Sequence, residues 1–256
     1  GTYTITYTAT DASGNIGTAT RTVTVVDATA PVITVTPGTD TVVQGGTWTD
    51  AGATSDGGET VTVSGTVDTS TPGTYIITYS ATDASGNTGT ATRTVTVNAL
   101  SIGDTHQGGI IFYLDGTGGG LIAALYPTGE PTRVWGCFGT EITGADGTAI
   151  GTGAQNTIDI ELGCPTSWAA NYCSTLALAG YNDWFLPSRD ELNLMYLNIG
   201  QGNALGLGNV GGFLNVSYWS STEMGSSLAW YKNFSNGFQD GAFKYENNYV
   251  RAVRAF

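Results

Sequence analysis

Charged residues make up only 11% of this 256-residue chain, and basic residues are the scarcest, with 8 Lys and Arg against 21 Asp and Glu. The formal net charge is −13 at pH 7, and the segments before and after residue 98 are both acidic. A protein that binds nucleic acid needs a basic patch that displaces counterions from phosphates. The composition therefore excludes nucleic acid as a partner.

Histidine occurs once, as His106, and cysteine three times. A single imidazole leaves no His pair to hold a metal ion, and the spacing of Cys137, Cys164 and Cys173 is unlike that of a zinc site. We interpret the cysteines as one disulfide and one buried thiol in an exported protein. Spacing leaves the pairing open, although Cys173 lies on the apolar face of an expected helix, which favours Cys137 with Cys164. No base is indicated beside any Ser or Cys, so we expect no catalytic residue.

Long apolar runs are also absent, so we expect no membrane-spanning segment. A repeat is present instead, because residues 1–15 return almost unchanged as residues 73–87. In both copies Tyr, Ile and Ala alternate with Thr or Ser, which is the pattern of a strand with one buried face. An Asp-Ala-Ser-Gly-Asn turn follows each copy's alternating run. Each copy is therefore predicted to be a β-hairpin.

Short β-rich runs separated by Gly, Pro and Asp lie between the copies, at 32–35, 60–63, 75–81 and 92–97. This spacing predicts a small sandwich. Residues 1–97 resemble bacterial surface immunoglobulin-like repeats, which implies an extracellular or cell-surface stalk. We expect a multidomain chain, in which an all-β part precedes an α+β domain. Its predicted parts are the closing hairpin of a truncated immunoglobulin-like repeat at 1–26, a complete immunoglobulin-like domain at 27–98 and a ligand-binding domain at 99–256.

Acidic and amide side chains cluster in the repeated turns and the linker, at Asp11, Asn15, Asp27, Asp83 and Asn87. Calcium prefers such oxygens, so a calcium site at the repeat junction is one interpretation. Asp and Asn in these turns also bond to their own backbone, and this is the role that we expect. We therefore expect no cofactor.

The composition and pattern of the sequence change after residue 100. Apolar runs at 108–114 and 118–125 predict a hairpin, and two helices are expected after it. Gly180 is the expected C-terminal cap of the first helix, and residues 188–191 form a capping box at the start of the second. Each helix has an apolar stripe that we expect in the core. The stripes are Trp168, Tyr172 and Leu176 in the first helix and Leu192, Met195, Tyr196 and Ile199 in the second.

Several separated motifs carry a family resemblance, in order along residues 101–256. They are residues 102–113, 147–153, 180–195, 218–223 and 249–256. These segments are similar to the Lcl C-terminal domain family. The resemblance implies a C-type-lectin-like fold. It also implies relatives among the variable proteins of diversity-generating retroelements, in which Asn codons of a template scatter into many residue types while framework residues stay fixed.

The last segment, residues 215–256, contains ten aromatic residues and eleven Ser or Asn. These residue types supply the contacts in antibody paratopes. An AAC or AAT codon altered only in its first two bases encodes Ser, Tyr, Phe, Leu, Asp, Ala or Gly, but not Met, Glu, Gln, Lys or Trp. The accessible positions between fixed-looking residues form the candidate ligand-binding set, namely Gly225, Ser226, Ser227, Leu228, Tyr231, Ser235, Phe238, Asp240, Gly241, Ala242, Phe243, Tyr245, Asn247 and Asn248.

Among these residues, the large aromatic side chains are the expected hot spots of binding, namely Tyr231, Phe238, Phe243 and Tyr245. Trp219 and Trp230 are flanked by fixed-looking residues and are expected in the core. The interpretation that some candidate positions are ordinary strand and loop residues stays open.

These observations favour a non-enzymatic cell-surface ligand-binding protein or adhesin with a diversified C-terminal face. Its expected partner is an unknown protein or a neutral glycan. One alternative is a glycan-binding adhesin without diversification, because the same family includes a domain implied to bind sulfated glycosaminoglycans; the acidic composition argues against such polyanions. The other is a formylglycine-generating-enzyme-like oxidase, which shares the lectin-like fold and would need reactive cysteines or copper ligands in a cleft.

Overall fold

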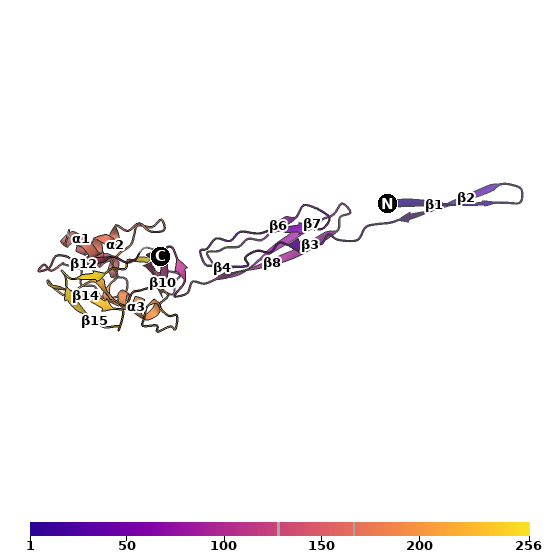
Figure 1. The fold of residues 1–256 in the computed structure, drawn as a ribbon. Helices are drawn as coiled ribbons and strands as arrows, with labels where there is room; N and C mark the ends of the chain where they lie inside the picture. Colours follow the sequence, from indigo (N-terminus) through magenta and orange to yellow (C-terminus); the bar gives the residue numbers. More distant parts are fainter. Residues whose placement is uncertain (127–128, 166) are drawn as a thin grey trace. The chain divides into compact units, whose positions relative to one another are not determined.

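The computed structural model describes residues 1–126, 129–165 and 167–256. It divides into two compact units, Gly1–Leu100 and Ser101–Phe256 (Figure 1). Strands dominate both units, and the helices of the described residues all lie in the second. The first unit contains β1 (Thr2–Thr10), β2 (Ile16–Thr24), β3 (Ile33–Val35), β4 (Thr41–Val43), β5 (Ala53–Ser55), β6 (Thr62–Ser64), β7 (Gly73–Thr82) and β8 (Thr88–Asn98).

The two sequence copies form antiparallel hairpins, β1 with β2 and β7 with β8, so the hairpin prediction is confirmed. Both turns are held by an aspartate. The Asp11 carboxylate accepts backbone hydrogen bonds from Ser13 and Asn15, each at 2.9 Å. The Asp83 carboxylate accepts the same bonds at 2.9 and 2.8 Å. These carboxylates therefore make the local turn bonds expected of them.

Residues 27–98 build a sheet in the order β4-β8-β7-β6 and a second, two-stranded sheet, β3-β5. The inward residues of β7 and β8 form its core, with Tyr79 and Val95 fully buried. Arg93 is buried among them, and it donates to the Tyr79 hydroxyl at 3.1 Å and forms an ion pair with Asp40. Arg93 also donates to the Thr36 carbonyl next to β3, so its bonds reach from the four-stranded sheet to the two-stranded one, and a buried charge needs such partners.

The second unit is an α+β unit with two sheets. Their orders are β17-β11-β10-β9 and β12-β16-β13-β14-β15. The strands are β9 (Thr105–His106), β10 (Gly109–Leu114), β11 (Gly120–Ala124), β12 (Thr132–Val134), β13 (Ser217–Glu223), β14 (Leu228–Asn233), β15 (Gln239–Phe243), β16 (Asn247–Tyr249) and β17 (Val253–Ala255). The predicted hairpin at 108–125 is confirmed as β10 with β11.

Helix α3 (Arg189–Ile199) joins the two sheets, since it contacts β10 in one and β13 and β14 in the other. The predicted capping box is present between Ser188 and Glu191. The predicted stripe is also confirmed, because Leu192, Met195 and Ile199 are fully buried. They pack in one core with aromatic residues of the second sheet, among them Tyr218. This core places the five-stranded sheet rigidly against α3.

The other two helices differ from the sequence predictions. Helix α2 spans only Trp168–Ser174 and is capped by Thr175, so Gly180 is not its cap. Its buried face consists of Ala169, Ala170 and Cys173. The predicted stripe is therefore wrong, because Trp168 is exposed, Tyr172 is only partly buried and Leu176 lies beyond the end of the helix. Helix α1 (Gly153–Gly163) was not predicted. Its buried residues are mostly small or polar, so it has no apolar stripe that a periodicity would reveal.

Candidate ligand-binding face

One face of the five-stranded sheet is closed by α3. On this face Lys232 of β14 pairs with Gln239 of β15. Lys232 Nζ donates to the Asn193 side chain at 2.8 Å and lies 4.7 Å from the centre of the Tyr196 ring. Gln239 Nε2 donates to the Arg189 carbonyl at 2.9 Å. Burial lowers the pKa of Lys232. These contacts attach the β14–β15 hairpin to the core and leave no room there for a ligand.

A hollow opens on the other side of the hairpin. Tyr231 and Asp240 form the next pair across β14 and β15, and neighbouring residues of a strand point to opposite faces. They therefore point away from α3. The hollow has a volume of about 500 Å³ and is lined by Ser217, Leu228, Tyr231, Gly241, Ala242, Phe243, Glu246 and Asn248. All of these except Ser217 and Glu246 belong to the candidate set.

Two lining residues are less open than the sequence suggested. Ala242 is buried, so it contributes to the floor of the hollow rather than to a protruding contact. The side-chain nitrogen of Asn248 is buried and has no hydrogen-bond partner among the described residues. A buried donor without an acceptor is unusual in a folded protein. The Asn248 side chain therefore has a hydrogen-bond donor available at the wall of this hollow.

Tyr231 is the aromatic side chain of this hollow. Burial raises the pKa of its hydroxyl, and the negative charges of Asp240 and Glu246 raise it further. Both carboxylates are exposed, and the described residues offer neither of them an ion pair. The hollow is therefore neutral to acidic in character, like the chain as a whole.

The arrangement around Tyr231 predicts a titration result. Replacing Asp240 by Asn together with Glu246 by Gln is expected to lower the pKa of Tyr231, because two of the three causes that raise it are removed. The measurement is an NMR pH titration of ¹³Cζ-labelled tyrosine, with the Tyr231→Phe variant assigning the signal. An unchanged Tyr231 pKa in the double variant would mean that the carboxylates do not face the ring.

Exposed aromatic side chains gather beside the hollow. Phe138, Phe243 and Tyr245 are 51%, 44% and 56% exposed. The rings of Phe243 and Tyr245 are stacked with centroids 5.3 Å apart, and Phe138 meets them edge-on at 6.1 and 5.0 Å. We call these three residues the aromatic cluster. Contiguous exposed aromatic residues are typical of interaction surfaces.

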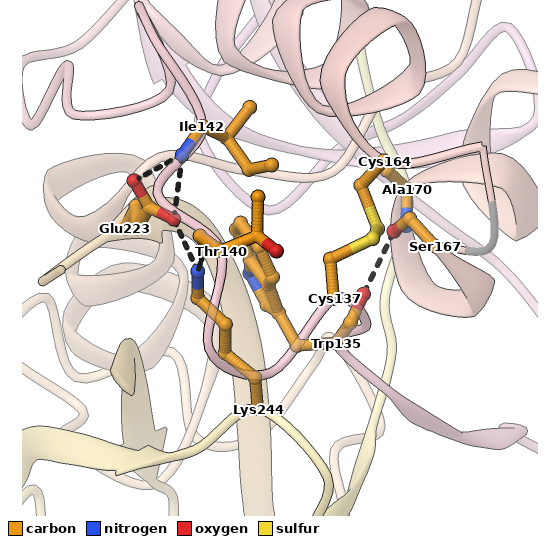
Figure 2. Close-up of a disulfide and its surroundings, with 9 residues drawn as sticks. All are labelled: Trp135, Cys137, Thr140, Ile142, Cys164, Ser167, Ala170, Glu223 and Lys244. Atoms are coloured by element: carbon orange, nitrogen blue, oxygen red, sulfur yellow. Dashed lines mark hydrogen bonds and ion pairs between the residues drawn. A yellow bond between two sulfur atoms is a disulfide. The ribbon is translucent and has the colours of Figure 1, made fainter. Parts of the chain in front are cut away.

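The buried side chain of Lys244 fixes the backbone that carries this cluster. It lies between two exposed aromatic residues of the cluster but is itself fully buried. Its Nζ atom forms an ion pair with Glu223, donates to the Thr140 carbonyl at 2.8 Å and lies 4.7 Å from the centre of the Trp135 ring (Figure 2). The Glu223 carboxylate also accepts from the backbone nitrogen of Ile142 at 2.9 Å. A buried charge pair therefore fixes the loop that carries Phe243 and Tyr245.

Backbone bonds and a disulfide complete this base. Gly136 donates to the Lys244 carbonyl at 3.1 Å, and Gly139 donates to the Ser226 carbonyl at 2.8 Å. Cys137, next to Phe138, is bonded to Cys164, which decides the pairing that the sequence left open. Figure 2 shows this disulfide close to the bond between Ser167 and the Trp135 carbonyl. Cys173 is the buried thiol.

The remaining candidates occupy two places. Gly225, Ser226 and Ser227 connect β13 to β14 near the aromatic cluster, and Asn247 lies in β16. Ser235 and Phe238 instead lie in the connection from β14 to β15. That connection is at the opposite end of the hairpin, roughly 16 Å away along the strand. Phe238 is exposed there, so the structure does not bring it together with the other hot-spot candidates.

Trp219 and Trp230 were expected in the core. Trp219 is fully buried, and its ring nitrogen donates to the Arg133 carbonyl at 3.0 Å. Trp230 is only partly buried, and the Arg189 guanidinium lies 5.2 Å from the centre of its ring. The core assignment therefore holds for Trp219 and is incomplete for Trp230.

Sequence reasoning missed Phe138 and Trp168 as surface residues. Phe138 lies between Gly136 and Gly139 beside a cystine, and this is a signal for an exposed turn that the sequence does contain. His106, the one histidine, lies against Phe256 with ring centroids 4.7 Å apart. Burial, and then the charge of Arg254, lowers the pKa of His106. Its contacts are thus those of a packed side chain.

Within the described residues, no group of three or more His, Cys, Asp and Glu is arranged to hold a metal ion. None of the helices in the same parts of the chain is long and apolar enough to cross a membrane.

Comparison with known families matches both units. Residues 1–25 and 33–97 match the family model of the bacterial surface protein, Ig-like domain. Residues 145–254 match the Lcl C-terminal domain. Both resemblances seen in the sequence are confirmed. The Lcl C-terminal domain match contains every candidate residue, whereas Phe138 and Cys137 lie before it.

Two solved structures were compared with the chain. A lipoprotein from Bacteroides thetaiotaomicron is 31% identical over 27% of this chain and 39% of its own, with a TM-score of 0.24. A fimbrial protein from Bacteroides ovatus is 13% identical over 97% of this chain and 74% of its own, with a TM-score of 0.42. The chain thus spans well under half of the lipoprotein. The search of curated proteins gave no match.

Proposed function

We propose that this chain is a bacterial cell-surface adhesin, in which immunoglobulin-like repeats form a stalk for a non-enzymatic C-type-lectin-like binding head. The binding face of the head is diversified in the manner of a retroelement variable protein. The two family matches support the surface role and the kind of head. The ligand is a protein or a neutral glycan.

One observation carries this proposal. Positions that an altered Asn codon reaches mostly line the hollow or lie on the surface, and positions that it does not reach are mostly buried or partly buried. Tyr231, Gly241 and Phe243, which an altered Asn codon reaches, line the hollow. Lys232 and Lys244, which it does not reach, are buried and bonded to the scaffold. A binding surface can vary in sequence without unfolding the protein only if the variable side chains are separate from those that hold the scaffold together. The exceptions are Met224 and Glu246, which are exposed although an altered Asn codon does not reach them, and Ala242, which is buried although it does.

The binding role is tested with a variant that carries Tyr231→Ala, Phe243→Ala and Tyr245→Ala. Truncating one central aromatic side chain costs on the order of 2 kcal/mol, or about thirtyfold in affinity, so the triple variant is expected to lose attachment. Attachment is measured on arrays of extracellular proteins and of neutral glycans. The matched control is Leu162→Ala, which removes an exposed apolar side chain of α1.

If the triple variant still attached to every target that the wild-type protein binds, the binding role would be contradicted. Turnover of a thiol substrate by the copper-loaded protein would contradict the non-enzymatic role. Diversification has its own test in the genome. A near-copy of the segment that encodes residues 225–248, differing only at adenines and lying beside a reverse transcriptase gene, is expected; its absence would refute diversification and leave the binding role standing.

A further inference from the structure

Trp168 is an exposed tryptophan that the proposed function does not use. It is 61% exposed, whereas the other tryptophans are partly or fully buried. Its position is fixed, because Ser167 before it caps α2 through a bond to Ala170 and donates to the Trp135 carbonyl at 2.8 Å. A large apolar ring that stays mostly exposed gains little from burial in the free protein. Such a ring is typical of a binding site.

Three hollows meet at Trp168. The first, of about 210 Å³, is shared with Phe138 and Tyr245 of the aromatic cluster. The second, of about 500 Å³, is shared with Thr132, Arg133, Val134 and Asn247. The third, of about 230 Å³, is shared with Pro165, Ser167 and Asn171. The largest of them is within the range of small-ligand sites, and the two smaller ones extend it around the same ring.

The chemistry of the three hollows is that of aromatic rings with a neutral polar rim. The rings are those of Trp168, Phe138 and Tyr245, and the rim offers the side chains of Asn171 and Asn247. No carboxylate is among the described residues that line them. Their cations are Arg133 and Lys244, and the latter is buried against Glu223. A pyranose ring matches such a site, because it has an apolar C–H face and hydroxyl groups around its edge.

We propose that these hollows form a calcium-independent subsite for a neutral oligosaccharide, with one sugar ring stacked on Trp168. Asn171, Asn247 and Arg133 bind hydroxyl groups of the same ring and its neighbours. The absence of carboxylates from the described lining gives a calcium ion no charged ligand there. The net charge of −13 disfavours a sulfated chain. The inference rests on the proposed function in that Tyr245 belongs to both sites.

The subsite is tested with three neutral probes, cellotriose, maltotriose and N,N′,N″-triacetylchitotriose, in millimolar titrations with EDTA present. At least one is expected to bind saturably, with saturation transfer to its ring C–H protons and a change in tryptophan fluorescence. Trp168→Ala is expected to weaken binding on the order of tenfold or more. Trp168→Phe is expected to retain part of the affinity. Folding of each variant is checked by near-UV circular dichroism.

The matched control is Leu162→Ala, which should bind the probe as wild type does. The inference is overturned if none of the three probes binds, if Trp168→Ala binds equally well, or if binding requires calcium. It is also overturned if only a heparin-derived disaccharide binds, or if the fluorescence change arises only with a protein ligand. Tyr231→Ala separates this site from the hollow beside β14, because it should leave probe binding unchanged even where it abolishes attachment to a partner.

Discussion

Replacing Lys244 by Ala is expected to lower the free energy of unfolding of the C-terminal unit by about 3–5 kcal/mol, because it leaves the buried Glu223 carboxylate without its ion pair. The substitution also removes the donor to the Thr140 carbonyl. Denaturant unfolding followed by tryptophan fluorescence reports on this unit, since only Trp48 lies in the other one. The denaturant concentration at the unfolding midpoint should be lower for the variant than for wild type.

Two comparisons isolate the cause. The neighbouring Tyr245→Ala substitution removes a larger but exposed side chain, so it should change stability by no more than about 0.5 kcal/mol. Combining Lys244→Met with Glu223→Leu removes both charges, so much of the loss should return. A Lys244→Ala midpoint equal to that of wild type would mean that the pair does not hold the loop.

Removing the disulfide with Cys137→Ser and Cys164→Ser is expected to cost about 2–5 kcal/mol of stability. The bond joins the segment that carries Phe138 to the segment that precedes Trp168, so its loss should also weaken binding of the neutral sugar probe. The same unfolding and titration measurements apply. A reductant should lower the stability of wild type and leave that of the double variant unchanged. Equal stability of the two oxidised proteins would contradict a stabilising role for the bond.

Sequence periodicity predicted the elements whose burial is regular. The β7–β8 hairpin alternates strictly, and α3 combines a capping box with an apolar stripe, so both were predicted correctly. Helix α1 was missed because Asn156 and Thr157 are on its buried face. Trp168 was misplaced because the four-residue spacing to Tyr172 marks a different face of α2 from the one that is buried, which consists of Ala169, Ala170 and Cys173.

The candidate face was predicted in part. Codon accessibility selected Tyr231, which lines the hollow, and Phe243 and Tyr245, which belong to the exposed aromatic cluster. It did not show that Phe238 lies at the far end of the hairpin, since that depends on strand register. It also gave no access to Phe138, which is distant in sequence and meets the rest of the cluster through tertiary contacts with Phe243 and Tyr245.

The alternation of residues 243–245 has an evolutionary consequence. The backbone there turns Phe243 and Tyr245 outward and Lys244 inward, and only the inward side chain holds the loop. If the outward pair binds a ligand as proposed, natural selection can act on these two side chains without acting on whether the chain folds. Substitutions at the two outward positions would then change specificity at little cost in stability.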